Sequence, residues 1–462
     1  MSAVSAWLDP EACPRERPPL AAMAEPTRDL HAAIDGQARR TGVPYLHPDE
    51  ATVQQDLLGS SAVVEWQEGK AAFLFAAEGC WSELPPLYAR YGTAATRGLI
   101  DRLKALEGAG AALVCDSGMQ ATALVFDSLM TPGAHAVLTR QVYNKTRSYM
   151  QWLVTRLGGT LTVVDDGEYD ALAAAITPAT RVVFAETFTN PLMRAQDPAR
   201  LVAVVAEARQ AGAVDARLVL DSTIATPWAF DTPLLAQGVD VVVASGTKAL
   251  SGTDRDLWGY VATNDTPTAN AVMDLVAMRG GVLDWRRATA ILDRLDGAEA
   301  AHARRCDTAT RVAAFLARHP RVAEVFHPSR PDHPDADIVR RHYRRHGSIV
   351  SFRVAGADEA RARHVADVLA TTTIVRYALS FDGLATKVNH HQTVSEYFTP
   401  PDQLRRNGID RLIRLGVGLE AAEDLVAALN WALHHAADVS PEAVAAWQRA
   451  RRSALERTPA RQ

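Results

Sequence analysis

The sequence predicts an α/β protein: a large domain built on a mainly parallel sheet, followed by a smaller α+β domain. The chain has 462 residues, of which 48% are hydrophobic, so it is long enough for two or three domains with a sizeable core. Between about residues 110 and 245, short apolar segments alternate with helical ones, a spacing typical of βαβ crossovers. After about residue 300, strand-like segments are mixed with amphipathic helices, which favours a second, smaller domain.

The first 300 residues are predicted to contain an N-terminal arm followed by the large domain. The first fifty residues are rich in proline, alanine and charged residues and show little strand signal, so we expect residues 1–85 to form an arm or a small helical cap. The large domain is expected over residues 86–300. Its predicted strands are the apolar segments 111–115, 135–139, 160–165, 181–186, 216–221 and 240–245. The helices predicted between them include 146–158, 170–176 and 198–212.

The C-terminal domain is expected over residues 301–462. An Ala/Arg-rich segment, 298–319, predicts the long helix that leads into it. Its predicted strands are 348–354 and 411–418. The arginine-rich end of the chain favours a solvated helix with a frayed tail over a binding patch.

Charge and cysteine content exclude several classes of protein. A net charge of −5 and a pI of about 6.3 argue against nucleic acid as an electrostatic partner. No apolar segment is long enough to cross a bilayer, and no secretory signal is visible at the N-terminus. Cys13, Cys80, Cys115 and Cys306 lie far apart without metal-ligand spacing, so we expect reduced thiols and no metal site. These features predict a cytoplasmic protein, and its length suits an enzyme.

Polar residues that end the predicted strands are the candidates for function, because ligands of parallel sheets bind at the carboxyl ends of the strands. The first strand runs into Asp116–Ser117–Gly118–Met119 and then a helix. A glycine-bearing turn at a helix start presents free N–H groups to a phosphate, although these residues also fit an ordinary helix cap. Asp221 ends another strand, where a carboxylate is costly to bury unless a cation such as a protonated ring nitrogen meets it. A cap or a structural ion pair explains Asp221 equally well.

Lys248 follows the apolar segment 240–245 almost directly. Partial loss of water lowers the pKa of an amine and frees its lone pair to attack a carbonyl, as a Schiff-base lysine must. Ser245 and Thr247 flank it with hydroxyls that suit a phosphate. A single lysine is usually a solvated surface residue. However, the order of these three features matches what pyridoxal phosphate (PLP) needs from a protein. The turn can bind its phosphate, the strand-end aspartate can pair with its ring nitrogen, and the lysine amine can bind its aldehyde.

The sequence then resembles the Cys/Met-metabolism PLP-dependent enzymes, which include cystathionine γ-synthase, the cystathionine lyases and methionine γ-lyase. The resemblance covers about residues 86–435 and rests on six motifs in the family's order. They are YARYGTAATRGLIDRLKALEG (88–108), DSGM (116–119), ETFTNP (186–191), LDSTIATP (220–227), SGTKALSG (245–252) and LIRLGVGLE (412–420). The resemblance implies a fold-type I transferase with a seven-stranded, mainly parallel sheet in the large domain.

The resemblance also implies roles for residues around the cofactor. Lys248 resembles the lysine that binds the PLP aldehyde and carries protons, and Asp221 the partner of the ring nitrogen. The implied phosphate ligands are Gly118, Met119, Ser245 and Thr247. Tyr88 and Arg90 resemble the pair that reaches the phosphate of a neighbouring subunit, which implies a homo-oligomer of active-site-sharing dimers, expected to be a tetramer. Tyr143 resembles the aromatic that stacks on the ring and acts in proton transfer, and Asn190 would lie near the phenolic oxygen of the ring.

Arg414 resembles the guanidinium that binds the substrate carboxylate, and Ser380 would assist it. Each of these residues also has an ordinary structural interpretation. Tyr88 could be a packing aromatic, Tyr143 could simply open a helix, and Arg414 could belong to a structural ion pair.

Several positions differ from the family's usual pattern. The stretch after the lysine loop reads Gly252–Thr253–Asp254–Arg255, where the family often has Gly-His-Ser-Asp. Lys145 stands two positions after Tyr143, where small residues or cysteine are usual, and brings a cation close to the leaving-group side. Leu379 precedes Ser380, where cystathionine γ-lyases carry glutamate, which argues against a substrate with a distal ammonium. We therefore expect an unusual amino-acid substrate.

The expected activity is γ-elimination or γ-replacement on an L-amino acid with a leaving group at Cγ. β-Elimination, of the cystathionine β-lyase or cysteine desulfhydrase type, remains an alternative because it uses nearly the same residues. A non-catalytic scaffold with the same fold is the third interpretation, and an inability to bind PLP would favour it.

Overall fold

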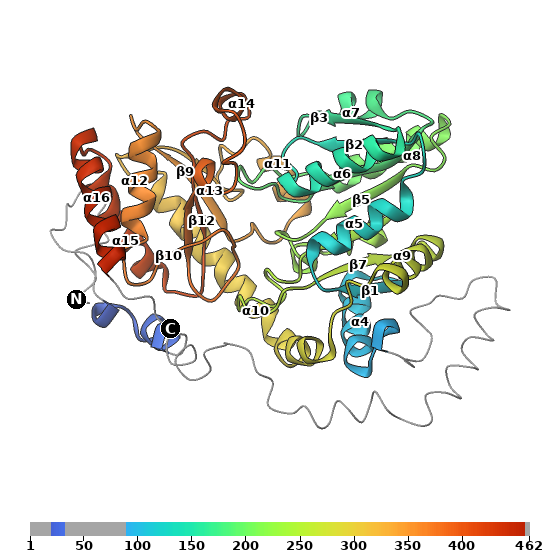
Figure 1. Cartoon of the computed structure of the whole chain (residues 1–462), viewed down its shortest axis with the longest axis horizontal. Coiled ribbons are helices and arrows are strands. Elements are labelled where there is room, and N and C mark those ends of the chain that lie inside the picture. The colour runs from blue at the N-terminus through green and yellow to red at the C-terminus, as the bar shows by residue number, and fades with distance from the viewer. Residues whose placement is uncertain (1–19, 33–88, 458–462) are drawn as a thin grey trace.

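The computed structural model describes residues 20–32 and 89–457 of the chain (Figure 1). Tyr88 and most of the predicted N-terminal arm, residues 1–85, lie outside the described residues. Figure 1 shows two sheet-containing regions side by side, with a long helix running between them. The α/β class with a second, smaller sheet domain is therefore confirmed.

The large domain contains a seven-stranded mixed sheet in the order β1-β7-β6-β5-β4-β2-β3. The strands are β1 (Ala111–Cys115), β2 (His135–Thr139), β3 (Thr160–Val164), β4 (Thr180–Glu186), β5 (Arg217–Asp221), β6 (Val241–Ala244) and β7 (Gly259–Thr263). The six predicted strands of this domain are all present, within one residue of the predicted bounds at nearly every end. The seventh, β7, was not located from the sequence pattern; it pairs antiparallel with both β1 and β6. All other pairings in this sheet are parallel.

Helices cover both faces of this sheet, as βαβ connections require. On one face the core contains side chains of α5 (Gly118–Leu129), α6 (Asn144–Leu157) and α9 (Thr266–Arg279). On the other it contains side chains of α4 (Ala94–Glu107), α7 (Tyr169–Ala175), α8 (Pro198–Gln210) and α10 (Trp285–Leu316). Because both faces are buried, strands such as Val241–Ala244 are apolar along their whole length and do not alternate.

The small domain contains a five-stranded sheet in the order β10-β11-β12-β9-β8. Its strands are β8 (Val322–Phe326), β9 (Ile349–Val354), β10 (Arg376–Tyr377), β11 (Lys387–His390) and β12 (Ile413–Gly416). Its helices are α12 (Glu359–Leu369), α13 (His391–Val394), α14 (Pro401–Arg406), α15 (Ala422–Ala436) and α16 (Pro441–Arg457). The short helix α11 (Ala336–His342) packs through Val339 on the core of the large domain. Helix α10 packs in the cores of both domains, so residue 300, the predicted boundary, lies inside a continuous helix.

The described N-terminal residues lie on the small domain. Residues 25–32 are helical. The Ala24 N–H donates to Asp424 (3.0 Å), and the buried His31 ring lies 3.1 Å from the Glu420 carboxylate. Glu420 also accepts hydrogen bonds from Thr386, so the N-terminal helix is tied to the segment that leads into β11.

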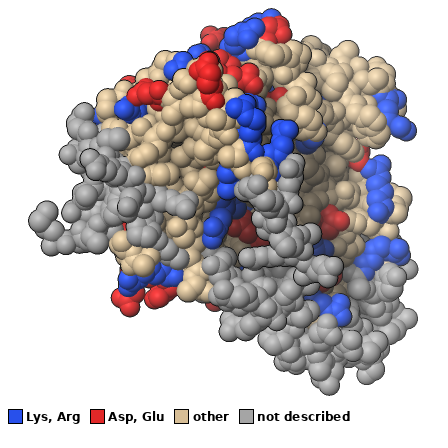
Figure 2. All heavy atoms as spheres, turned by 60° about the vertical axis from the view of Figure 1, so that its left-hand side comes forward, with Lys and Arg blue, Asp and Glu red and all other residues tan. Residues whose placement is uncertain are grey.

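The surface carries charges of both signs. In the view of Figure 2, acidic and basic side chains are intermixed, and several basic side chains gather beside a hollow near the centre of the face. Within residues 20–32 and 89–457, no helix is both long and apolar enough to cross a membrane. The same residues contain no cluster of three or more His, Cys, Asp or Glu side chains that could hold a metal ion.

Candidate active site

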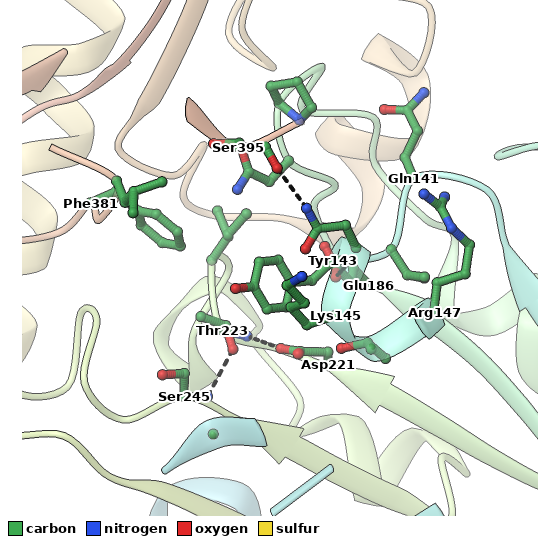
Figure 3. Close-up of a pocket in the computed structure, with 18 of the residues that line it drawn as sticks. Gln141, Tyr143, Lys145, Arg147, Glu186, Asp221, Thr223, Ser245, Phe381 and Ser395 are labelled. Carbon is green, nitrogen blue, oxygen red and sulfur yellow. Dashed lines mark hydrogen bonds between the residues drawn. The ribbon is translucent and has the colours of Figure 1, made fainter. Parts of the chain in front are cut away.

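A cavity of about 440 Å³ opens at the carboxyl ends of the large sheet, where the small domain covers it (Figure 3). Two walls enclose it. The sheet wall consists of Gly118, Tyr143, Glu186, Asp221, Ser245 and Lys248, which follow or end strands of the large sheet. The domain wall consists of Leu379, Ser380, Phe381, Arg414 and residues 394–398 of the small domain. In Figure 3, Tyr143 and Asp221 point into the cavity and Phe381 faces them from the opposite side.

Lys248 lies in the turn that follows β6. Its Nζ donates a hydrogen bond to Ser380 Oγ (2.8 Å) and lies 5.0 Å from the centre of the Phe381 ring. Burial, together with the nearby Arg414 and Lys387 cations, lowers the pKa of this amine to about 8. Asp382 and Asp254 act in the opposite direction. An amine with a lowered pKa is available as a nucleophile and as a base near neutral pH.

Asp221 ends β5, and Glu186 stands beside it in register at the end of β4. Asp221 accepts a hydrogen bond from the Thr223 N–H (2.8 Å), yet burial raises the pKa of its carboxyl to about 6. Burial also raises the pKa of Glu186 well above its usual range, and the Asp221 charge raises it further. Two adjacent carboxylates, one half-buried and one buried, favour a cation in the cavity, such as a protonated ring nitrogen.

The first turn of α5 forms the floor of the sheet wall. Ser117 caps this helix through its side chain, and Gly118 and Met119 line the cavity. A Cβ atom at Gly118 would lie 2.6 Å from the Ser245 Cβ, so only glycine allows the helix start to approach the turn after β6 this closely. The Gly118 and Met119 N–H groups thus lie at a helix N-terminus next to the Ser245 side chain, an arrangement suited to a phosphate.

Thr247 does not line the cavity beside Gly118 and Ser245. Its hydroxyl donates to the Trp258 carbonyl (3.1 Å) and accepts from the Trp258 N–H (3.0 Å), and the residue is not among those that line the cavity. The expected phosphate contact of Thr247 stays a prediction, and the contact that the structure shows is that of its hydroxyl with the backbone of Trp258, the residue before β7. The position of β7, which the sequence did not reveal, decides this contact.

Tyr143 begins α6 and lies over the cavity with 47% of its surface exposed. Its N–H donates to the Glu186 carboxylate, and burial, with the Glu186 charge, raises the pKa of its phenol. Lys145, two residues on, also lines the cavity, and its ammonium lies 4.7 Å from the centre of the Phe398 ring. Because the pKa of its phenol is raised, Tyr143 keeps its proton at neutral pH and can act as a proton donor.

Arg414 projects from β12 and is 2% exposed. One guanidinium nitrogen donates to the carbonyls of Leu379 and Ser380, and another lies 3.4 Å from Asn190 Oδ1. Its buried Nε has no hydrogen-bond partner among the described residues. Burial lowers the pKa of the guanidinium to about 10. A buried cation with an unused N–H favours an anionic ligand such as a carboxylate.

Arg90 lies apart from this cavity. It belongs to the short helix η4 (Ala89–Tyr91), it is exposed, and its guanidinium lies 5.5 Å from the centre of the Tyr91 ring. The expected contact of Arg90 and Tyr88 with a neighbouring subunit stays a prediction.

The residues present fit PLP. The glycine-lined helix start suits its phosphate, the half-buried Asp221 suits its ring nitrogen, and the Lys248 amine suits its aldehyde. Glu186 was missed as a site residue in the sequence, although the argument that selected Asp221, a carboxylate that ends a buried strand, applies to it equally.

Known proteins resemble the chain in sequence and in structure. The sequence profile of the family described as Cys/Met metabolism PLP-dependent enzyme matches residues 70–434. A chloroplastic cystathionine γ-synthase from Arabidopsis thaliana is 32% identical over 348 residues, which is 75% of this chain and 60% of the plant protein. A cystathionine β-lyase from Bacillus subtilis is 31% identical over 354 residues, which is 76% of this chain and 87% of the bacterial protein.

A crystal structure of cystathionine γ-lyase from Lactobacillus plantarum in complex with L-serine superposes with a TM-score of 0.70 at 26% sequence identity. The superposition covers 77% of this chain and 89% of that one. The relatives thus include a γ-synthase, a β-lyase and a γ-lyase, all enzymes of the same cofactor class. The chain belongs to the family of Cys/Met metabolism PLP-dependent enzymes.

Proposed function

We propose that the chain catalyses γ-elimination or γ-replacement on an L-amino acid with a leaving group at Cγ. The observation that best supports this proposal is the half-buried Lys248 amine, which has a pKa lowered to about 8 and shares one cavity with the buried Arg414 guanidinium. γ-Chemistry needs a base that serves both Cα and Cβ of a substrate held by its carboxylate. A single mobile amine next to a carboxylate-binding cation meets that need.

Substrate binding rests on the domain wall in this proposal. Arg414 binds the α-carboxylate through its planar guanidinium, with Ser380 beside it. On the sheet wall, Asp221 holds a proton on the ring nitrogen of the cofactor, and Gly118, Met119 and Ser245 bind the phosphate. When bound, PLP supplies an electron sink that stabilises negative charge developing on the substrate.

The proton transfers fall to two side chains. Lys248 Nζ takes the Cα proton and then moves a proton at Cβ. The Cγ–X bond breaks, X leaves with the electron pair, and the Tyr143 hydroxyl supplies its proton. In elimination, water converts the remaining fragment into a 2-oxo acid and ammonia. In replacement, an external nucleophile H–Nu takes the place of X, and HX is released.

β-Elimination remains the second candidate, because a cystathionine β-lyase is 31% identical to the chain. The two reactions use nearly the same residues and differ in the carbon that carries the leaving group. Lys145 and Leu379 line the cavity and are proposed to select the substituent.

The test is a visible absorption spectrum of the purified protein, recorded before and after addition of L-amino acids with assay of 2-oxo acid release. Methionine, acylated homoserines and γ-halogenated analogues form one set, and β-substituted analogues the other. We expect a spectral change with product release from the γ-set. A response to the β-set alone would assign the chain to the β-lyases, and a protein that cannot bind PLP would revive the scaffold interpretation.

The assembly and location of the protein are part of the proposal. We propose a homo-oligomer, expected to be a tetramer of active-site-sharing dimers, in the cytoplasm, with no nucleic-acid or membrane partner. Light scattering coupled to size-exclusion chromatography measures the mass of the assembly, and a monomeric active enzyme would contradict the subunit-sharing role of Tyr88 and Arg90.

A further inference from the structure

An ion pair lies next to the cavity without lining it. Lys387, in β11, is 8% exposed, and its ammonium donates to both carboxylate oxygens of Asp254, at 2.6 and 2.7 Å. Asp254 lies six residues after Lys248, in the stretch that departs from the family's usual motif, and its side chain is 35% exposed. Neither residue is among those that line the cavity, so neither is placed to contact the substrate.

One loop joins this pair to Lys248. A Cβ atom at Gly383 would lie 1.7 Å from Asp254 Oδ2 and 2.0 Å from Lys387 Nζ, so the pair packs directly against the backbone at this position. Three residues earlier, Ser380 accepts the hydrogen bond from Lys248 Nζ. Loop 380–383 therefore contacts the pair at one end and the Lys248 amine at the other.

Further charged groups surround this arrangement. Arg305, buried in α10, donates to the carbonyls of Gly383 and Gly252 and so fixes the two loops together. Around Lys248, the cations are Arg414 and Lys387 and the anions are Asp382 and Asp254. Arg414 is proposed to bind substrate, whereas both charges of the ion pair lie outside the cavity lining. The pair can therefore be changed without removal of a residue that lines the cavity.

We propose that Asp254 and Lys387 are positioning residues that set how readily Lys248 Nζ holds its proton. The pair acts through its two opposite charges and through loop 380–383. The inference rests on the proposed function, which gives Lys248 the proton transfers. Lys387 disfavours the protonated amine and Asp254 favours it to a smaller extent, so the two charges partly offset each other. Loss of either partner leaves the effect of the other without this offset.

The test follows the pH at which the visible absorption of the bound cofactor changes in the holoenzyme, which reports the proton at Lys248 Nζ. Lys387→Met removes the cation that lowers the pKa of the Lys248 amine and leaves Asp254, which acts in the opposite direction. We expect the transition to move up by roughly half a unit to one unit. Asp254→Asn should move it down, and by less, because the effect of Asp254 on the pKa of Lys248 is smaller than that of Lys387.

The double variant Asp254→Asn/Lys387→Met should return the transition close to that of the wild type, since both charges are gone. Lys104→Met, which removes a lysine of α4 far along the chain from the cavity, controls for net charge. The ascending limb of the pH profile of kcat should move with the spectrum. Unchanged transitions in both single variants, or shifts of the same sign, would overturn the proposal and leave a purely structural pair.

Two further points keep the outcomes separate. If Asp254→Asn fails to fold, Lys387→Met and the double variant still decide the question, because they differ only in the charge at position 254. Borohydride reduction and peptide mapping of the wild type establish first that the cofactor is attached to Lys248. Attachment elsewhere rejects the proposed function, whereas attachment at Lys248 with unmoved transitions rejects the role of the pair alone.

Discussion

The two walls of the cavity bury charges of opposite sign. On the sheet wall, burial raises the pKa of Asp221 to about 6 and raises that of Glu186 well above its usual range, so these carboxylates favour a cation beside them. On the domain wall, burial lowers the pKa of Arg414 to about 10, so this guanidinium favours an anion. The cause is the same on both sides, since loss of water disfavours whichever form is charged. The cavity therefore suits a ligand with a cationic group against the sheet and an anionic group against the small domain.

The two walls also differ in how they are built. The residues of the sheet wall stand at or just after the carboxyl ends of strands that run in the same direction, so the topology of one sheet brings them together. The domain wall depends on contacts between distant segments, such as Lys248 with Ser380 and Asn144 with Ser395. Changes to each wall should therefore have different consequences, and the following variants test that difference.

Lys248→Ala should have the largest effect, because it removes the amine that serves both walls. We expect turnover to fall by roughly 10³-fold or more. Steady-state kinetics measure the loss, and circular dichroism checks that the fold is retained. Lys104→Ala, in α4, is the matched control. A Lys248→Ala enzyme with wild-type rates would contradict the proposed mechanism.

Asp221→Asn tests the sheet wall with a nearly isosteric side chain. The amide cannot hold a proton on the ring nitrogen, so we expect turnover to fall by roughly 10²- to 10³-fold. The variant also removes the charge that raises the pKa of Glu186, and that pKa should fall. Turnover within a few-fold of the wild type would indicate that Glu186, and not Asp221, balances the cation.

Arg414→Lys tests the domain wall while it retains the positive charge. A lysine cannot bind a carboxylate with two parallel N–H groups, and hydrogen bonds to charged groups contribute about 1.5–3 kcal/mol. We therefore expect KM to rise roughly 10- to 100-fold, with a smaller change in kcat. An unchanged KM with a lower kcat would mean that Arg414 acts in the chemical step and does not anchor the substrate.

Asn144→Ala should have the smallest effect, because it cuts only a tie between the walls. The Asn144 amide donates to the Ser395 carbonyl (2.7 Å) and to the Glu396 carboxylate (3.2 Å). Loss of these hydrogen bonds should lower the free energy of unfolding by about 1–2 kcal/mol, as measured in urea. Gln151→Ala, on the exposed side of the same helix, should leave the stability unchanged. Equal effects of the two substitutions would show that this tie does not hold the walls together.

Much of the sheet wall could be predicted from the sequence, and the reason is local. An apolar segment that is buried on both faces predicts a strand, and the polar residues at or just after its end must stand at the sheet edge, as Asp221 and Ser245 do. Glu186 obeys the same rule. The close approach of Gly118 to Ser245 was consistent with the motif, but only the coordinates show that a side chain at residue 118 would not fit.

The sequence by itself determined the fold class, the strands of the parallel sheet, the cofactor family and the order of the residues that end the strands. The tertiary structure alone decided the place of β7, the engagement of Thr247 with Trp258, and the pairing of Asp254 with Lys387 across 133 positions. The reason is that neighbouring residues determine whether a segment forms a buried strand, whereas a hydrogen bond between distant segments depends on how whole layers pack.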